Sequence, residues 1–145
     1  MKSIMIIGPA FSGKSELAKF LNVLEPKATV LNVKNICISK ALSSGENPDT
    51  ITRSFTEEEV RDALGSYLDG FKEGKTVILD GLISDLSQEG LLFSYDFIDH
   101  VILIKKDSDI EMFEKLKKQL EDKHKEFTVL EFKDNKLSIP NVFKL

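Results

Sequence analysis

A glycine-rich stretch at residues 8–15 constrains this chain more than any other part of it. Its sequence, GPAFSGKS, fits the pattern G-x-x-x-x-G-K-S/T. The apolar residues 3–7 before it predict a short buried strand, and residues 16–24 after it carry leucine and phenylalanine at helical spacing. Strand, glycine loop and helix are the context in which this pattern binds phosphate. We therefore predict a nucleotide-phosphate site here.

The residues of the loop have distinct expected roles. Glycines let backbone N–H groups curl around phosphate oxygens, and the positive end of the helix faces the same anion. Lys14 is expected to contact the β- and γ-phosphates, and the Ser15 hydroxyl to bind Mg²⁺. The predicted nucleotide-binding residues are Gly8, Pro9, Ala10, Phe11, Ser12, Gly13, Lys14, Ser15 and Glu16.

Length and composition predict one globular domain spanning residues 1–145. The chain is 41% hydrophobic and 30% charged, which is ordinary for such a domain. Its formal charge of −4 argues against a broad nucleic-acid surface. The single cysteine, Cys37, allows no intrachain disulfide and is expected to be a small buried hydrophobe.

The start of the sequence and the length of its apolar runs bear on the cellular compartment that we expect for the protein. Only Lys2 separates the initial Met from the first strand, and no apolar run approaches the ~18 residues of a membrane span. We expect a cytoplasmic chain whose partners are a nucleotide and a small acceptor. The sequence carries no signal of its oligomeric state.

Strand-like and helix-like segments alternate along the chain. Strands are expected at residues 3–7, 28–33, 75–80, 100–104 and 127–132, with a turn at 134–136 and an edge strand in the tail 137–145. This alternation predicts an α/β fold, a three-layer doubly wound sheet of about five parallel strands with the phosphate loop after the first strand. Ligands are then expected beyond the carboxyl ends of the strands.

Two of the expected helices carry start signals. Thr56 and Glu59 form one capping box, and Ser108 and Glu111 form another. In the helix that begins after Thr56, one apolar face is expected to carry Val60, Ala63, Leu64, Tyr67, Leu68 and Phe71. The second is expected to point Ile110, Phe113, Leu116 and Leu120 inward.

Three other segments are less regular. Residues 35–42 suggest a short helix, and residues 43–49 a loop that is either a substrate-contacting segment or a plain surface connection. Residues 81–90 suggest a loop with a helical turn, and residues 91–98 an apolar segment that packs on the sheet.

Asp80 is a second anchor for the site, because it ends an apolar strand. An aspartate there is placed to hold Mg²⁺ beside the phosphates. The next residue is Gly81, where hydrolytic ATPases of similar core carry a glutamate that activates water. Its absence favours phosphoryl transfer to a bound acceptor.

Residues 77–81, VILDG, resemble the V-x-L-D-G strand of adenylate-kinase-like nucleoside monophosphate kinases. The resemblance covers residues 1–120 and implies nucleotide binding by Gly8, Gly13, Lys14 and Ser15, with Mg²⁺ positioning by Asp80. The chain departs from that family in three ways. Its loop has fewer glycines, an arginine expected after the D-G pair is replaced by LISD, and an arginine-rich lid is missing.

A second resemblance is to the adenosylcobinamide kinase group, through SGKS at residues 12–15 and LDGL at residues 79–82. That group is longer and uses a histidine to accept a guanylyl group. His100 and His124, the two histidines here, lie at a strand start and in a charged helix end, and we expect structural or solvated roles for both.

On the acceptor side, the candidates are few. Asp80 and Asp85 are the candidate general bases on an acceptor hydroxyl, and Asp85 is alternatively a helix N-cap. The two arginines are Arg53 and Arg61; Arg53 is the candidate phosphate or substrate contact. Because lysine replaces an arginine fork poorly, a monophosphate acceptor is disfavoured.

The leading hypothesis is a small kinase that uses ATP, or GTP, with Mg²⁺. Lys14, Asp80 and Asp85 are its predicted catalytic residues, and Ser15 and Asp80 its metal ligands. The alternatives are a catalytically weak nucleotide-binding regulatory or scaffold subunit and an adenosylcobinamide-kinase-like enzyme. A DNA-associated ATPase is disfavoured by the acidic balance.

Overall fold

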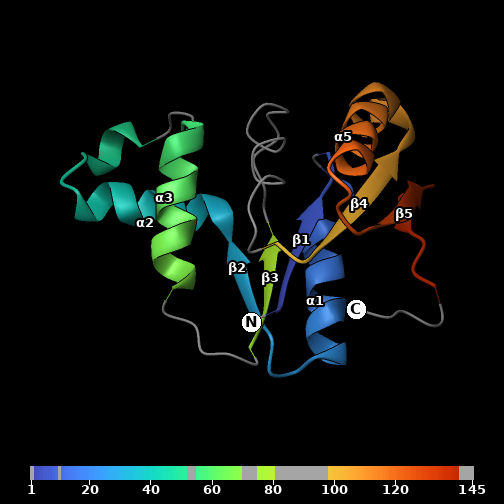
Figure 1. Cartoon of the computed structure of the whole chain (residues 1–145), viewed down its shortest axis with the longest axis horizontal. Coiled ribbons are helices and arrows are strands. Elements are labelled where there is room, and N and C mark those ends of the chain that lie inside the picture. The colour runs from blue at the N-terminus through green and yellow to red at the C-terminus, as the bar shows by residue number, and fades with distance from the viewer. Residues whose placement is uncertain (1, 10, 52–54, 70–74, 81–97, 141–145) are drawn as a thin grey trace.

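Apolar segments from along the chain assemble into one mostly parallel sheet (Figure 1). The computed structural model describes residues 2–9, 11–51, 55–69, 75–80 and 98–140. Within these residues the sheet has six strands in the order β2-β3-β1-β4-β5-β6, all parallel except the last pair. The strands are β1 (Lys2–Ile7), β2 (Thr29–Asn32), β3 (Thr76–Asp80), β4 (His100–Lys106), β5 (Phe127–Lys133) and β6 (Lys136–Leu137).

Helices cover both faces of this sheet. The α-helices are α1 (Lys14–Leu24), α2 (Val33–Ser43), α3 (Glu57–Leu68) and α5 (Ile110–Asp122), and the 3₁₀ turns are η1 (Pro48–Thr50) and η2 (Asp107–Asp109). Figure 1 shows α1 lying along the central strands, α2 and α3 together beside β2, and α5 over β4. None of the described helices is both long enough and apolar enough to span a membrane.

The two-residue period of β1 divides the core into two layers. Ile4 and Ile6 pack in a cluster with Leu17 and Leu21 of α1. The alternate residue Met5 lies in a second cluster on the other face, together with α2, α3 and α5. Each such side chain is fully buried and contributes about 1.5–3 kcal/mol through the hydrophobic effect. The sheet is therefore a middle layer between two layers of helix.

Strand order places a topological switch point at β1. From β1 the chain moves first to the β3 side, where β2 and β3 lie, and then to the β4 side, where β5 and β6 follow. At such a switch point the connections on either side leave in opposite directions, and open α/β sheets bind their ligands beyond the carboxyl ends of these strands. Residues 8–15 begin at that edge.

Most sequence-based elements are confirmed, and α2 is longer than its predicted range of 35–42. The Thr56 capping box is present, with Glu59 N–H donating to Thr56 Oγ1 over 3.2 Å and Thr56 N–H donating to Glu59 Oε1 over 3.0 Å. Phe71, residues 81–97 and residues 141–145 lie outside the described residues.

Two predictions about elements were wrong, and the bounds of a third differ by one residue. Ser108 does not cap α5, because the chain enters that helix through η2 and the Ser108 hydroxyl donates to Asp109 Oδ2 over 3.1 Å. Tyr67, expected on the apolar face of α3, and Ile110, expected inward on α5, are 46% and 45% exposed. The edge strand expected in the tail is present as β6, and it begins one residue earlier than predicted because the turn takes only Asp134 and Asn135. Both turn residues have positive φ, as in a tight two-residue hairpin.

Candidate functional site

The glycine loop, defined as residues 8–15, connects β1 to α1 at the switch point of the sheet. β1 ends at Ile7 and α1 begins at Lys14. Gly8, Pro9 and Ser12 are buried, so the base of the loop is part of the packed structure. Ala10, predicted to bind nucleotide, lies outside the described residues.

The first glycine of the pattern is required by close packing. A Cβ atom on Gly8 would lie 2.7 Å from Ser12 Oγ and 2.9 Å from Ile104 Cβ. Both distances are shorter than nonbonded contacts allow. The Ser12 hydroxyl is itself fixed, because it donates to the Pro9 carbonyl oxygen over 2.6 Å. Gly8 thus lets the loop turn directly against β4.

The loop also needs left-handed backbone at two places. Gly13 has φ of 83°, which glycine adopts without strain, and it occupies the N-cap position of α1. Phe11 has φ of 57°, which is unusual for a residue with a Cβ, and its side chain is 91% exposed. A strained residue in a tightly packed loop is characteristic of functional sites.

The start of α1 has the polarity of an anion site. No side chain caps it, and the first intrahelical bond is the Leu17 N–H donating to the Gly13 carbonyl over 2.9 Å. The N–H groups before Leu17 have no partner within the helix, and the helix dipole adds partial positive charge there. Lys14 brings a full charge, and its ammonium donates to the Gly8 carbonyl over 2.9 Å. Ser15 and Glu16 are exposed in the same first turn.

Asp80 lies at the same edge of the sheet as the loop. Leu79 pairs with Met5 of the neighbouring β1, so Asp80 is level with the last residues of that strand. Because Ile78 lies in the core cluster of α1, the alternation of β3 puts Asp80 on the α1 face as well. It is buried, with 8% of its surface exposed. A buried carboxylate thus faces the helix that begins in the glycine loop.

The remaining candidate residues either lie outside the described residues or belong to other elements of the structure. Asp85 and Arg53 lie outside the described residues, and Arg61 is exposed on α3. His100 shares a hydrogen bond of 2.8 Å between its Nε2 and Thr128 Oγ1, whereas His124 is exposed. Among the described residues, no group of three or more His, Cys, Asp or Glu is arranged to hold a metal by itself.

A hollow of about 170 Å³ lies between α2 and α3. It is lined by Cys37, Lys40, Ala41, Ser44, Glu46, Phe55, Glu59 and Asp62. Burial and, secondarily, the charge of Glu59 raise the pKa of the Cys37 thiol to about 11. Three carboxylates face one ammonium around this hollow, so its balance of charge is acidic.

One residue at the loop was missed by sequence reasoning. The Lys106 ammonium at the end of β4 donates to the Phe11 carbonyl over 3.3 Å and lies 5.6 Å from the centre of the Phe132 ring. The only available signal was a pair of lysines that ends an apolar strand. The contact joins residues 95 apart, which no local pattern reveals.

Comparisons with known proteins identify no family for this chain. No family model matches the chain, and no curated protein matches it. Among solved structures, it is similar to a gluconokinase from Sinorhizobium meliloti 1021, with 12% sequence identity and a TM-score of 0.49 over 90% of this chain and 82% of that one. The function of the chain is therefore inferred from its own residues.

Proposed function

We propose that this chain is a small Mg²⁺-dependent kinase that binds ATP, or GTP, in the glycine loop. It would transfer the γ-phosphoryl group to a nucleotide, a nucleoside or another hydroxyl-bearing acceptor. The observation that carries the proposal is the loop itself. Gly8 packs against β4 where no Cβ fits, Gly13 turns the chain into α1, and Lys14 is the first residue of that helix.

The loop supports phosphate binding by three additive effects. Backbone N–H groups at the start of α1 can donate to phosphate oxygens, and the helix dipole attracts their charge. Lys14 adds a point charge beside them. Phosphoryl transfer needs mainly positioning and neutralisation of charge, and these are what such a loop provides.

The residues near the loop fit a magnesium ion held jointly with the nucleotide. Mg²⁺ usually takes one or two protein oxygens and completes its shell with water and substrate phosphates. The Ser15 hydroxyl and the Asp80 carboxylate are hard oxygen donors of this kind. A bound ion would neutralise charge on the phosphates.

The remaining roles fall to residues named from the sequence. Lys14 would stabilise the transferring phosphoryl group, and Asp80 would orient the ligands around Mg²⁺. Asp85 is the proposed general base, and Arg53 the proposed acceptor contact. Gly81 follows Asp80 in place of an acid that could activate water, which supports transfer over hydrolysis.

A neutral hydroxyl acceptor is favoured within this proposal. The chain has only two arginines, Arg53 and Arg61, and Arg61 is exposed on α3. A bidentate arginine is the strongest side-chain contact for a phosphate. The acidic lining of the hollow between α2 and α3 likewise disfavours an anionic acceptor there. The same scarcity of arginine supports a second candidate, a nucleotide-binding regulatory or scaffold subunit with weak catalysis.

An assay of ADP release separates these candidates. The protein is incubated with Mg-ATP alone and with a panel of sugars, nucleosides and nucleoside monophosphates, and Lys14→Ala and Asp80→Asn are compared with Lys19→Ala on the exposed face of α1. Acceptor-dependent release that is lost in the first two variants and kept in the third supports the kinase. Nucleotide binding with no turnover supports the subunit. Turnover that survives Lys14→Ala refutes the proposed site.

A further inference from the structure

We infer that Lys106 is a positioning residue of the nucleotide site, which fixes the Phe11–Ser12 peptide in the orientation that receives phosphate. This inference rests on the proposed function of the glycine loop. Lys106 is the last residue of β4, on the opposite side of β1 from Asp80. The loop is therefore flanked by a carboxylate from β3 and an ammonium from β4.

The side chain of Lys106 reaches the loop because of its place in β4. Ile102 and Ile104 lie in the core cluster of α1, so the alternation of the strand puts Lys106 on the same face. There its ammonium donates to the Phe11 carbonyl and lies over the Phe132 ring. That ring also borders the loop, since a Cβ on Gly13 would lie 3.7 Å from Phe132 Cδ2.

The contact with Phe11 determines which way one peptide of the loop faces. In a planar trans peptide the carbonyl and the following N–H point in opposite directions. Because Lys106 holds the Phe11 carbonyl, the Ser12 N–H points away from Lys106. An N–H group that faces a phosphate donates a hydrogen bond to it, whereas a carbonyl oxygen in the same place repels it. Phe11 has the unfavourable φ of 57°, so this peptide needs an external contact to hold it.

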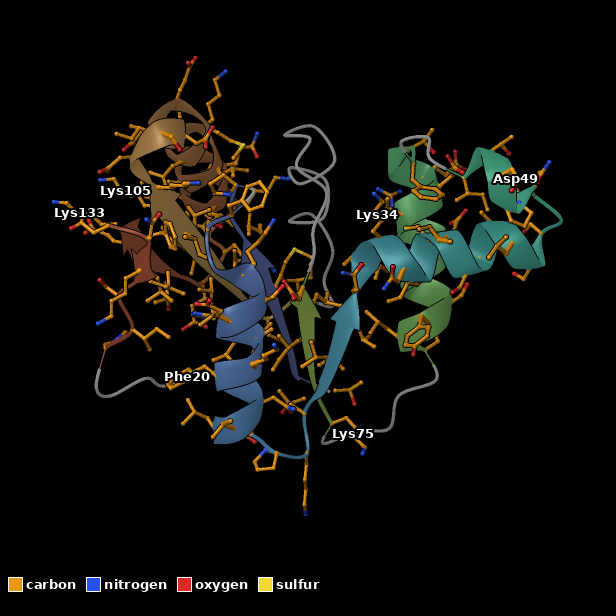
Figure 2. All side chains as sticks on the ribbon, turned by 180° about the vertical axis from the view of Figure 1, so that it is seen from behind. Phe20, Lys34, Asp49, Lys75, Lys105 and Lys133 are labelled. Atoms are coloured by element: carbon orange, nitrogen blue, oxygen red, sulfur yellow. The ribbon has the colours of Figure 1, made fainter. Side chains whose placement is uncertain are left out.

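The neighbouring Lys105 provides a natural control. It also lies over an aromatic ring, with its ammonium 5.5 Å from the centre of Phe113 in α5. Phe113 belongs to the core cluster on the other face of the sheet. Figure 2 labels Lys105 at the end of β4. The two lysines therefore lie on the same strand, carry the same charge and each contact an aromatic ring. They differ in the face of the sheet on which their side chains lie.

The test compares Lys106→Met, Lys106→Arg and Lys105→Met with the wild-type protein. Affinities for Mg-ATP and for inorganic tripolyphosphate are measured by calorimetry, and melting temperatures by circular dichroism. We expect Lys106→Met to weaken both ligands about 10-fold, as loss of a charged hydrogen bond does. Lys106→Arg should recover most of that loss, and Lys105→Met should bind within about 2-fold of wild type while losing as much thermal stability as Lys106→Met.

Each outcome decides a different point. If the wild-type protein binds Mg-ATP, and Lys106→Met and Lys105→Met both bind it as tightly as the wild type does, the inference is wrong and the proposed function stands. If affinity falls in both in proportion to lost thermal stability, Lys106 has only a structural role and the inference is again wrong. If the wild-type protein binds neither probe, the proposed function fails, and the role of Lys106 fails with it.

Discussion

Substitution of Gly8 by alanine tests the packing on which the glycine loop depends. The added Cβ would lie 2.7 Å from Ser12 Oγ and 2.9 Å from Ile104 Cβ. The first atom is anchored by its bond to the Pro9 carbonyl, and the second is attached directly to the backbone of β4. Neither can turn away as the end of a flexible side chain could. The loop itself must move away from β4.

The size of the effect follows from that displacement. Overpacking by one methyl group at a rigid site costs roughly 1–3 kcal/mol of unfolding free energy. For a domain of this length, each kcal/mol lowers the melting temperature by about 2–4 °C. Nucleotide affinity should fall as well, because Gly8 also provides the carbonyl that binds Lys14.

Two other glycines supply matched controls for the same substitution. Gly65, inside α3, has open space where its Cβ would be, so Gly65→Ala should raise stability by up to about 1 kcal/mol. Gly45 also has open space but a φ of 90°, so Gly45→Ala should cost about 1 kcal/mol or more through the backbone alone. Only Gly8→Ala is expected to lower nucleotide affinity.

Urea unfolding followed by circular dichroism measures all three variants. A changed midpoint with an unchanged slope reports stability alone. In the Gly8→Ala background, Ser12→Ala should recover part of the loss, whereas Ile104→Ala should not, since alanine keeps the Cβ in contact. Wild-type stability in Gly8→Ala, or full recovery of stability when Ile104→Ala is added to it, would contradict a steric clash between Gly8 and its two neighbours.

Three further predictions concern single features of the structure. Phe11→Gly should leave the free energy of unfolding in urea unchanged or raise it by up to about 1 kcal/mol. The relief of the left-handed strain at Phe11 outweighs the conformational entropy that glycine loses on folding, so a clear loss of stability would contradict this prediction. Thr56→Ala should cost about 1 kcal/mol by removing the capping box of α3, and an unchanged urea midpoint would argue against that cap. Burial raises the pKa of the Cys37 thiol from 9.0 to about 11, so the unfolded chain ionises first and stability should fall as pH rises from 9 to 11. Cys37→Ala should show a flatter pH profile over that range, and parallel profiles would contradict the raised pKa.

The candidate site could be predicted from the sequence where its geometry is local. The glycine pattern lies in one short stretch, and its flanks indicated a strand and a helix that the structure confirms. Asp80 could be placed because the carboxyl ends of parallel strands meet at one edge, and register puts it level with the end of β1. The left-handed φ of Phe11 had no local signal, since that conformation is normally the property of glycine or asparagine.

Features that depend on distant segments could not be predicted in the same way. Lys106 contacts Phe11 across the switch point, and nothing in either segment specifies the other. The Ser108 pattern predicted a cap, but the backbone enters α5 through a 3₁₀ turn, which leaves its hydroxyl beside Asp109 instead. Ile110 then falls at the first position of α5, where it is partly exposed, so helical periodicity failed at the helix end.

The decisive measurement for the glycine loop is the affinity of the intact chain for Mg-ATP, compared between the wild-type protein and Lys14→Ala. The matched control is Lys19→Ala, which removes an exposed lysine from the same helix. We predict that calorimetry shows binding by the wild-type and Lys19→Ala proteins and a loss of about 10- to 100-fold in Lys14→Ala. Equal affinity in all three proteins, or no binding by the wild-type protein, would contradict the assignment of residues 8–15 as a nucleotide site.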